Sequence, residues 1–116
     1  MKTILVAEDN DGNYILMTYI LKKKYEIKRA INGQEAVDKV AAGGIDMILM
    51  DIKMPVMDGL EATRRIREAN PELPIIALTA NAYESDRESA FEAGCNDFIA
   101  KPVNCQTTLE TIAKYI

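Results

Sequence analysis

The sequence contains no histidine and only two cysteines, Cys95 and Cys105. Without an imidazole, the chain cannot carry its own phosphohistidine, use a histidine as a general base, or bind zinc through histidine nitrogen. The two cysteines lie 10 residues apart, which matches neither a CxxC motif nor the spacing of a metal finger. We therefore expect reduced structural thiols rather than a disulfide or a zinc site.

Positive charges are outnumbered, with 14 Lys and Arg against 18 Asp and Glu, and long apolar runs are scarce. The formal net charge is −4, which argues against a general binder of nucleic acid or of anionic membranes. The one basic cluster lies between residues 22 and 29, and we interpret it as a solvated helix end and strand edge. The apolar run at 4–7 stops at Glu8, far short of the ~20 apolar residues that span a bilayer. We expect a cytoplasmic protein with no nucleic-acid and no membrane partner.

Short apolar runs alternate with helical patterns along the whole chain. The 116 residues suit one domain, residues 1–116, with an ordinary hydrophobic share of 48%. The predicted strands are residues 3–7, 26–30, 47–50, 75–79 and 97–100, and the predicted helices are residues 11–23, 33–42, 59–69, 85–93 and 104–116. Apolar strands that alternate with helices are typical of a parallel sheet covered on both faces. The sequence therefore predicts an α/β domain of the doubly wound (βα)5 type.

The first predicted helix has an apolar stripe that should face the core. Ile15, Leu16, Tyr19 and Ile20 share one side at helical spacing, and Asp11 is the expected N-cap. The helix at 85–93 has few apolar residues, so we expect it to be held less firmly than the others.

Reactive polar groups follow four of the five predicted strands. Glu8 and Asp9 follow the first, Asp51 the third and Lys101 the fifth, while Thr79 ends the fourth. Ligands of open parallel sheets bind at the carboxyl ends of the strands. Each residue alone is common there, since acids often cap the next helix. As a set they predict a single phosphate-handling site.

Three of these groups are carboxylates. If the first and third strands are neighbours, about 4.8 Å apart, Asp9 and Asp51 lie side by side with Glu8 close by. A hard cation would relieve their repulsion, and oxygen-only ligands favour Mg²⁺, with Mn²⁺ as a second hard cation that suits them. Lys101 can add a point charge and Thr79 a hydroxyl donor for a phosphoryl oxygen.

These residues resemble the response-regulator receiver domain of two-component signalling. The set occurs in the family's order, with gaps of 42, 28 and 22 residues between Asp9, Asp51, Thr79 and Lys101. The segments 54–59 (MPVMDG) and 79–82 (TANA) also match the family's pattern. The resemblance covers nearly the whole chain and implies a CheY-like, flavodoxin-like fold with strand order 2-1-3-4-5. The segments 8–10 (EDN) and 79–82 (TANA) are similar to those of receivers attached to hybrid histidine kinases. The chain also resembles single-domain regulators.

The resemblance implies a role for each residue of the site. Asp51 would accept the phosphoryl group, and Glu8, Asp9, Asp51 and the backbone carbonyl of Lys53 would hold Mg²⁺. Lys101 would pair with Asp51 at rest and with the phosphoryl group afterwards.

The family also implies a switch. Thr79 would turn toward a phosphoryl oxygen and Phe98 would move inward, altering the face formed by the fourth helix, fifth strand and fifth helix. Lys53 and Asn81 would influence the lifetime of the acylphosphate, and the Lys101–Pro102 bond would be cis.

The implied partner is a histidine kinase or a histidine phosphotransfer protein, which donates the phosphoryl group. The domain would be a phosphoacceptor that slowly loses its phosphoryl group, not a turnover enzyme. We expect a monomer or a weak dimer.

Three alternative functions are compatible with parts of this pattern. A phosphatase of the haloacid-dehalogenase kind needs a second Asp two residues after the nucleophile, where this chain has Lys53. A binding module that is not phosphorylated usually lacks one acid or the lysine, and none is lost here. A flavodoxin needs a neutral, hydroxyl-rich phosphate loop, whereas the loop after the first strand begins with Glu8 and Asp9.

Overall fold

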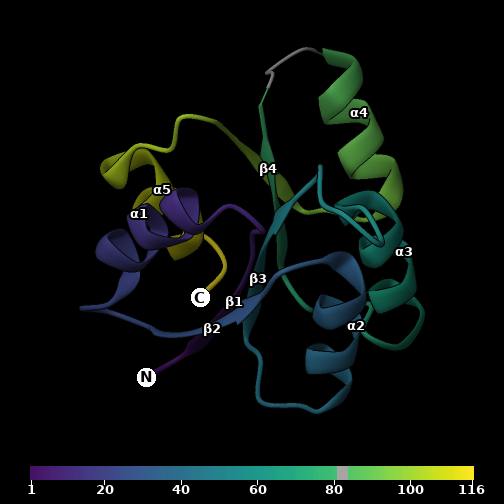
Figure 1. Ribbon diagram of the computed structural model, residues 1–116, viewed down its shortest axis with the longest axis horizontal. Coiled ribbons are helices and arrows are strands. Elements are labelled where there is room, and N and C mark those ends of the chain that lie inside the picture. Colours follow the sequence, from purple (N-terminus) through teal and green to yellow (C-terminus); the bar gives the residue numbers. More distant parts are fainter. Residues whose placement is uncertain (81–83) are drawn as a thin grey trace.

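The chain forms a central parallel sheet with helices on both faces (Figure 1). The computed structural model describes residues 1–80 and 84–116. The strands are β1 (Thr3–Ala7), β2 (Glu26–Ala30), β3 (Met47–Asp51), β4 (Ile75–Thr79) and β5 (Asp97–Ala100). The helices are α1 (Asp11–Leu21), α2 (Gly33–Ala41), α3 (Gly59–Ala69), α4 (Glu84–Ala93) and α5 (Cys105–Ala113).

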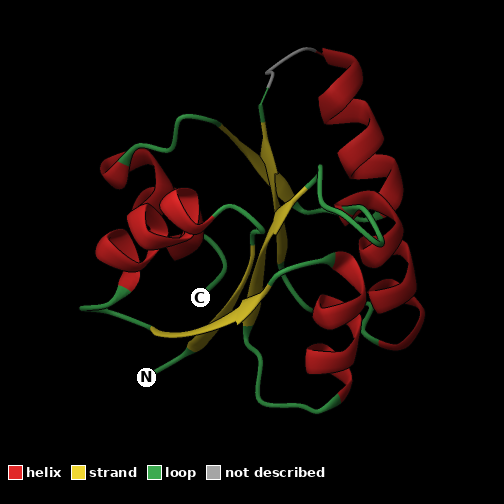
Figure 2. Cartoon of the chain, viewed as in Figure 1, coloured by secondary structure: helices red, strands yellow, loops and turns green. Residues whose placement is uncertain are grey.

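The sheet order is β2-β1-β3-β4-β5, with every neighbouring pair parallel. Helices α1 and α5 cover one face, and α2, α3 and α4 cover the other (Figure 2). The predicted fold and strand order are therefore confirmed. Among the described residues, no helix is long and apolar enough to cross a bilayer.

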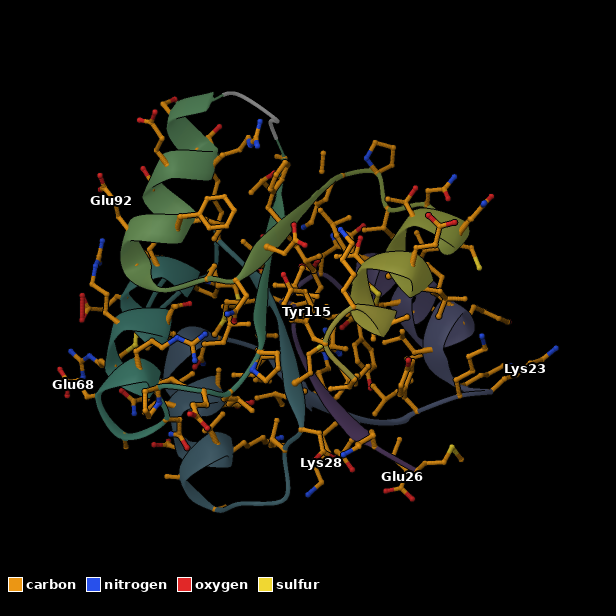
Figure 3. All side chains as sticks on the ribbon, turned by 180° about the vertical axis from the view of Figure 1, so that it is seen from behind. Lys23, Glu26, Lys28, Glu68, Glu92 and Tyr115 are labelled. Atoms are coloured by element: carbon orange, nitrogen blue, oxygen red, sulfur yellow. The ribbon has the colours of Figure 1, made fainter. Side chains whose placement is uncertain are left out.

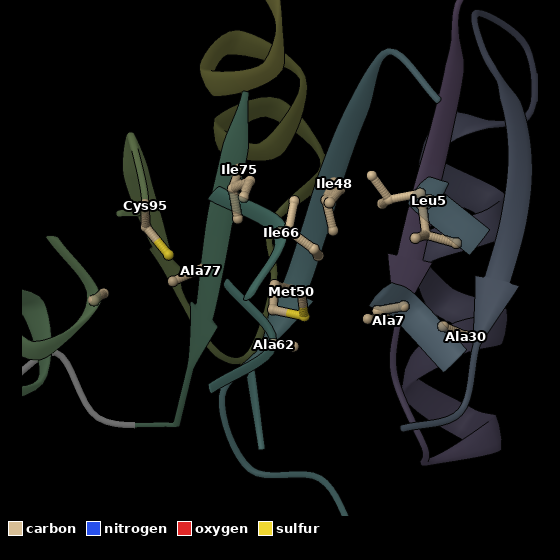
Figure 4. Close-up of a cluster of buried hydrophobic side chains, with 13 residues drawn as sticks. Leu5, Ala7, Ala30, Ile48, Met50, Ala62, Ile66, Ile75, Ala77 and Cys95 are labelled. Atoms are coloured by element: carbon tan, nitrogen blue, oxygen red, sulfur yellow. The ribbon is translucent and has the colours of Figure 1, made fainter. Parts of the chain in front are cut away.

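Side chains of the central strands feed two apolar clusters, one on each face. In β3, Ile48 and Met50 pack on the side of α2, α3 and α4, while Met47 and Leu49 pack on the side of α1 and α5. This alternation is the two-residue period of a strand, and it leaves all five residues of β3 buried. Figure 4 shows Ile48 and Met50 beside Ile66, with the first of these two clusters around them.

Several helix ends differ from their predicted positions. Asn10, not Asp11, caps α1, because its side-chain oxygen accepts the amide of Asn13 at 2.9 Å. Helix α1 ends at Leu21 rather than at residue 23, and in the turn that follows the amides of Lys24 and Tyr25 both donate to the carbonyl of Leu21. Helix α5 likewise begins one residue later than predicted and ends three residues earlier.

The predicted core stripe of α1 is wrong except at Ile20, which is buried as predicted. Ile15 and Tyr19 are 53% and 67% exposed, whereas Met17 and Leu21 are buried with Ile20. Helix α1 carries two overlapping apolar stripes, and the spacing 17, 20, 21 fits the helical period as well as the predicted one. The residues of the second stripe are buried because they pack into the apolar cluster between the sheet and α5.

Candidate functional site

The carboxyl ends of four strands meet at one pocket of about 300 Å³. Strands β1 and β3 are neighbours, so the loop after β1 lies beside the last residue of β3. The pocket is lined by six residues predicted from the sequence: Glu8, Asp9, Asp51, Lys53, Thr79 and Lys101. Parallel pairing, which brings equivalent strand ends to one edge, is what assembles them.

Glu8, Asp9 and Asp51 form a compact acidic cluster. One carboxylate oxygen from each lies within 4.8 Å of the others. Glu8 and Asp51 are 2% and 6% exposed, while Asp9 faces solvent. Buried like charges at this separation repel strongly unless a cation joins them.

Lys101 supplies one such cation. Its ammonium donates to Glu8 Oε1 at 2.9 Å and to Asp51 Oδ2 at 3.0 Å. Burial lowers the pKa of Lys101, but the hydrogen bonds to Glu8 and Asp51 outweigh burial and raise it overall. Lys101 is therefore a charged donor shared by two acids.

One lysine does not neutralise three carboxylates. Burial and the proximity of Asp51 raise the pKa of Glu8, and the hydrogen bond from Lys101 only partly opposes that rise. The uncompensated negative charge and the all-oxygen donor set fit a hard divalent cation such as Mg²⁺. The exposed side of the cluster, at Asp9, leaves such an ion its remaining water ligands.

Thr79 is buried at the end of β4 with an unused hydroxyl. It is 4% exposed, and its Oγ1 has no hydrogen-bond partner among the residues that the structure describes. Its backbone carbonyl accepts the amide of Lys101 at 2.7 Å, which ties the two pocket residues together. An unpaired buried hydroxyl is costly, so a new acceptor in the pocket would find a ready donor.

Phe98 lies on β5, on the sheet face that Thr79 also occupies. Phe98 pairs with Ala77 and Thr79 pairs with Ala100, so the two side chains are diagonal neighbours. The Phe98 ring is half-buried and meets the ring of Phe91 edge-on, with centroids 6.5 Å apart. The proposed switch residues are thus adjacent, and Phe98 contacts α4.

Two glycines hold the loop between Asp51 and α3. A side chain at Gly59 would collide with the carbonyl of Asp51, and one at Gly33 would collide with the carbonyl of Met57. The amide of Gly33 donates to that same Met57 carbonyl at 2.9 Å. Gly33, the first residue of α2, therefore supports the loop that follows Asp51.

Arg29 contacts the loop after β1 in a way that the sequence did not reveal. Lys23 and Lys28 of the same basic cluster point into solvent, as predicted (Figure 3). The side chain of Arg29 is only 25% exposed and donates to the backbone of Glu8 and Asp9. Its place one residue before the end of β2, the strand next to β1, is the signal that could have indicated it.

Two family-derived details remain. The Lys101–Pro102 bond is cis, as predicted. Asn81, predicted to influence acylphosphate lifetime, lies outside the described residues.

The fold and the pocket together define a doubly wound domain with an acid, lysine and hydroxyl site at its sheet edge. The family model described as "Response regulator receiver domain" matches residues 4–113. The chain belongs to the response-regulator receiver family.

Curated relatives include both a short regulator and a much longer one. The polar-differentiation response regulator DivK of Brucella anthropi is 36% identical, over 99% of this chain and 96% of DivK. The response regulator SSK1 of Cochliobolus heterostrophus is 37% identical over 87% of this chain. The match spans only 18% of that SSK1 protein.

Solved receivers have the same fold. The receiver domain of Saccharomyces cerevisiae Ssk1, crystallised with the phosphotransfer protein Ypd1, has a TM-score of 0.93 at 35% identity, over 98% of this chain and 88% of that one. The receiver of sensor histidine kinase PA1611 from Pseudomonas aeruginosa has a TM-score of 0.91 at 38% identity, over 98% and 96%. That structure has a magnesium ion in its active-site cleft. The predicted family is therefore confirmed.

Proposed function

We propose that Asp51 is the residue that accepts the phosphoryl group, and that Glu8, Asp9, Asp51 and the backbone carbonyl of Lys53 hold Mg²⁺ for that reaction. The observation that carries this proposal is the position of Lys101, whose ammonium bonds both buried acids of the cluster. Residues 1–116 would act as one receiver domain.

The geometry suits a nucleophile that needs its charge controlled. Asp51 Oδ2 bonds Lys101, while Oδ1 accepts the backbone amide of Lys53 at 3.3 Å, so the carboxylate orientation is fixed from two sides. Bound Mg²⁺ would supply neutralisation of phosphoryl charge. Phosphoryl transfer depends chiefly on such positioning and charge stabilisation. The ammonium of Lys101 would then pair with a phosphoryl oxygen in place of the Asp51 carboxylate.

Thr79 and Phe98 would transmit the change. The acylphosphate carries roughly −1.5 to −2 charges in place of the single charge of the carboxylate, and the unpaired Thr79 hydroxyl can then donate to it. Movement of Thr79 opens space beside its diagonal neighbour Phe98 and disturbs the contact of Phe98 with α4. The surface formed by α4, β5 and α5 would thereby change for a partner protein.

The donor would be a phosphohistidine on a histidine kinase or histidine phosphotransfer protein. The likeness to the Ssk1 receiver that was crystallised with Ypd1 supports this class of partner. The absence of histidine from this chain requires that the donor imidazole come from another protein or domain.

We further propose that the domain does not turn over a substrate. Lys53, two residues after the acceptor, is exposed and cannot act as the carboxylate acid and base that a haloacid-dehalogenase phosphatase uses there. The acylphosphate would therefore be lost slowly to water.

The test is phosphorylation by acetyl phosphate with Mg²⁺, followed by intact mass spectrometry. We expect a gain of one phosphoryl group that is absent in Asp51→Asn and in a sample with EDTA. Phosphorylation of Asp51→Asn to the same extent would move the acceptor elsewhere. No gain in the wild type would leave a binding module with a preserved site.

A further inference from the structure

A guanidinium group on β2 holds the backbone of the acidic loop after β1. Arg29 Nε donates to the carbonyl oxygen of Glu8 at 3.1 Å, and Nη2 donates to the carbonyl oxygen of Asp9 at 3.3 Å. Nη2 also bonds the carboxylate of Asp11 at 2.8 Å. All three acceptors lie within residues 8–11, the segment that carries two of the three carboxylates of the cluster.

Arg29 is itself held in place. Its backbone is in register with Val6 on β1, and the next residue, Ala30, accepts the amide of Glu8 at 2.9 Å. The guanidinium carbon lies 4.4 Å from the centroid of the Tyr14 ring on α1. Since strand pairing fixes one end of the side chain and an aromatic ring covers the other, the rigid fork has little freedom.

We propose that Arg29 is a positioning residue for the metal site: it binds the two carbonyls so that the carboxylates of Glu8 and Asp9 stay gathered beside Asp51. The inference rests on the proposed function, because it assumes that the cluster binds Mg²⁺. Without the fork, repulsion among the carboxylates can open the loop. Part of the free energy of Mg²⁺ binding is then used to order the loop, so the affinity falls. Residues that orient metal ligands commonly matter about tenfold or more for affinity.

Charge and positioning predict opposite results. Arg29 is a cation near a cation site, so its charge alone opposes Mg²⁺. If charge were its only role, Arg29→Gln would bind Mg²⁺ more tightly and Arg29→Lys would bind it as the wild type does. If Arg29 positions the loop, both variants bind Mg²⁺ more weakly, since neither side chain reproduces the fork.

The experiment is calorimetric titration of Mg²⁺ into the full chain and both variants, without phosphodonor. We expect the dissociation constant to rise about tenfold in Arg29→Lys and in Arg29→Gln. With acetyl phosphate, the Mg²⁺ concentration for half-maximal phosphorylation should rise in parallel, while the rate at saturating Mg²⁺ stays near that of the wild type.

Arg67 provides a matched control. It too is an arginine that binds backbone carbonyls, those of Gly94, Asn70 and Leu73. These carbonyls lie before the amino ends of β4 and β5, whereas the pocket lies at the carboxyl ends of the strands. Arg67→Lys should lower the thermal unfolding midpoint and leave the Mg²⁺ dissociation constant unchanged. A general loss of stability is thereby separated from a loss of positioning.

Amide exchange in metal-free protein gives a second readout. The amide of Asn10 donates to Glu8 Oε2 at 3.3 Å, so opening of the loop should speed its exchange in Arg29→Lys but not in Arg67→Lys. Unchanged Mg²⁺ affinity and exchange in both Arg29 variants, with normal binding by the wild type, would overturn the inference alone. Absence of Mg²⁺ binding by the wild type would overturn it together with the proposed metal site.

Discussion

The guanidinium carbon of Arg87 lies over the ring of Phe98, 4.6 Å from its centroid. Phe98 is therefore held between two side chains of α4, with Arg87 at its face and Phe91 at its edge. In the resting domain, these contacts favour the half-buried position of the ring over a fully inward one.

Arg87→Ala should loosen this hold. Loss of an exposed cation–π contact costs about 0.5–1 kcal/mol, which would raise the inward population of Phe98 about two- to fivefold. The chain has two phenylalanines, so ¹⁹F-phenylalanine labelling would give two resonances, and the one lost in Phe98→Leu reports the switch. Arg64→Ala, which removes an exposed arginine on α3, is the control; an equal shift in both variants would contradict the prediction.

Replacement of Thr79 by Val should stabilise the resting domain and impair signalling. Valine has the same shape without the unpaired buried hydroxyl, so we expect the free energy of unfolding to rise by about 1 kcal/mol. Phosphorylation should persist, but binding of the phosphorylated form to its output partner should fall to the unphosphorylated level.

Thr108 is the matched control for Thr79. Its buried hydroxyl, on α5, is likewise unpaired among the described residues, and it does not line the pocket. Urea denaturation should show a similar gain for Thr108→Val, whereas phosphorylation-dependent binding should be intact. Equal partner binding by phosphorylated Thr79→Val and wild type would refute a switch role for Thr79.

Glu8→Gln should stabilise the metal-free protein while weakening Mg²⁺ binding. Burial and Asp51 raise the pKa of Glu8 above its ordinary value of 4.5. The protonated carboxyl of Glu8 therefore contributes its full share to the free energy of unfolding below pH 4.5, and this contribution is lost as the pH rises through the folded-state pKa. Gln has no such loss, and the advantage of the variant should therefore grow with pH above 4.5.

Urea denaturation in EDTA across that pH range measures the effect. A Glu8→Gln difference that stayed flat with pH would show that the ionised form of Glu8 is not penalised by folding.

The two thiols should react at very different rates. Burial raises the pKa of Cys95, although Thr63 at 3.9 Å and Arg67 partly oppose the rise, so the thiol stays protonated and inaccessible. Cys105 is exposed at the start of α5. A colorimetric disulfide reagent should modify one thiol of the native protein quickly and the second only on unfolding. Cys105→Ser should lose the fast phase, and its retention would assign that phase to Cys95.

The sequence alone was sufficient for the fold class and for most of the pocket. Alternating apolar runs and helical patterns predicted the (βα)5 order, because strands buried on both faces need a continuous apolar run. The set Glu8, Asp9, Asp51, Thr79 and Lys101 was predicted because parallel strands bring their carboxyl ends to one edge, so position along the chain determines position in space.

Only the tertiary structure decided which face of α1 is buried and what Arg29 does. Two apolar stripes of α1 fit the helical period equally well, and only packing against the sheet and α5 buried Met17 and Leu21 while exposing Ile15 and Tyr19. In the sequence, Arg29 belongs to a basic cluster whose lysines face solvent. Its contacts with Glu8 and Asp9 join residues about 20 positions apart in the chain, and they exist only because β2 pairs with β1. Composition and periodicity describe local preference, whereas contacts between distant segments are fixed by how the elements pack.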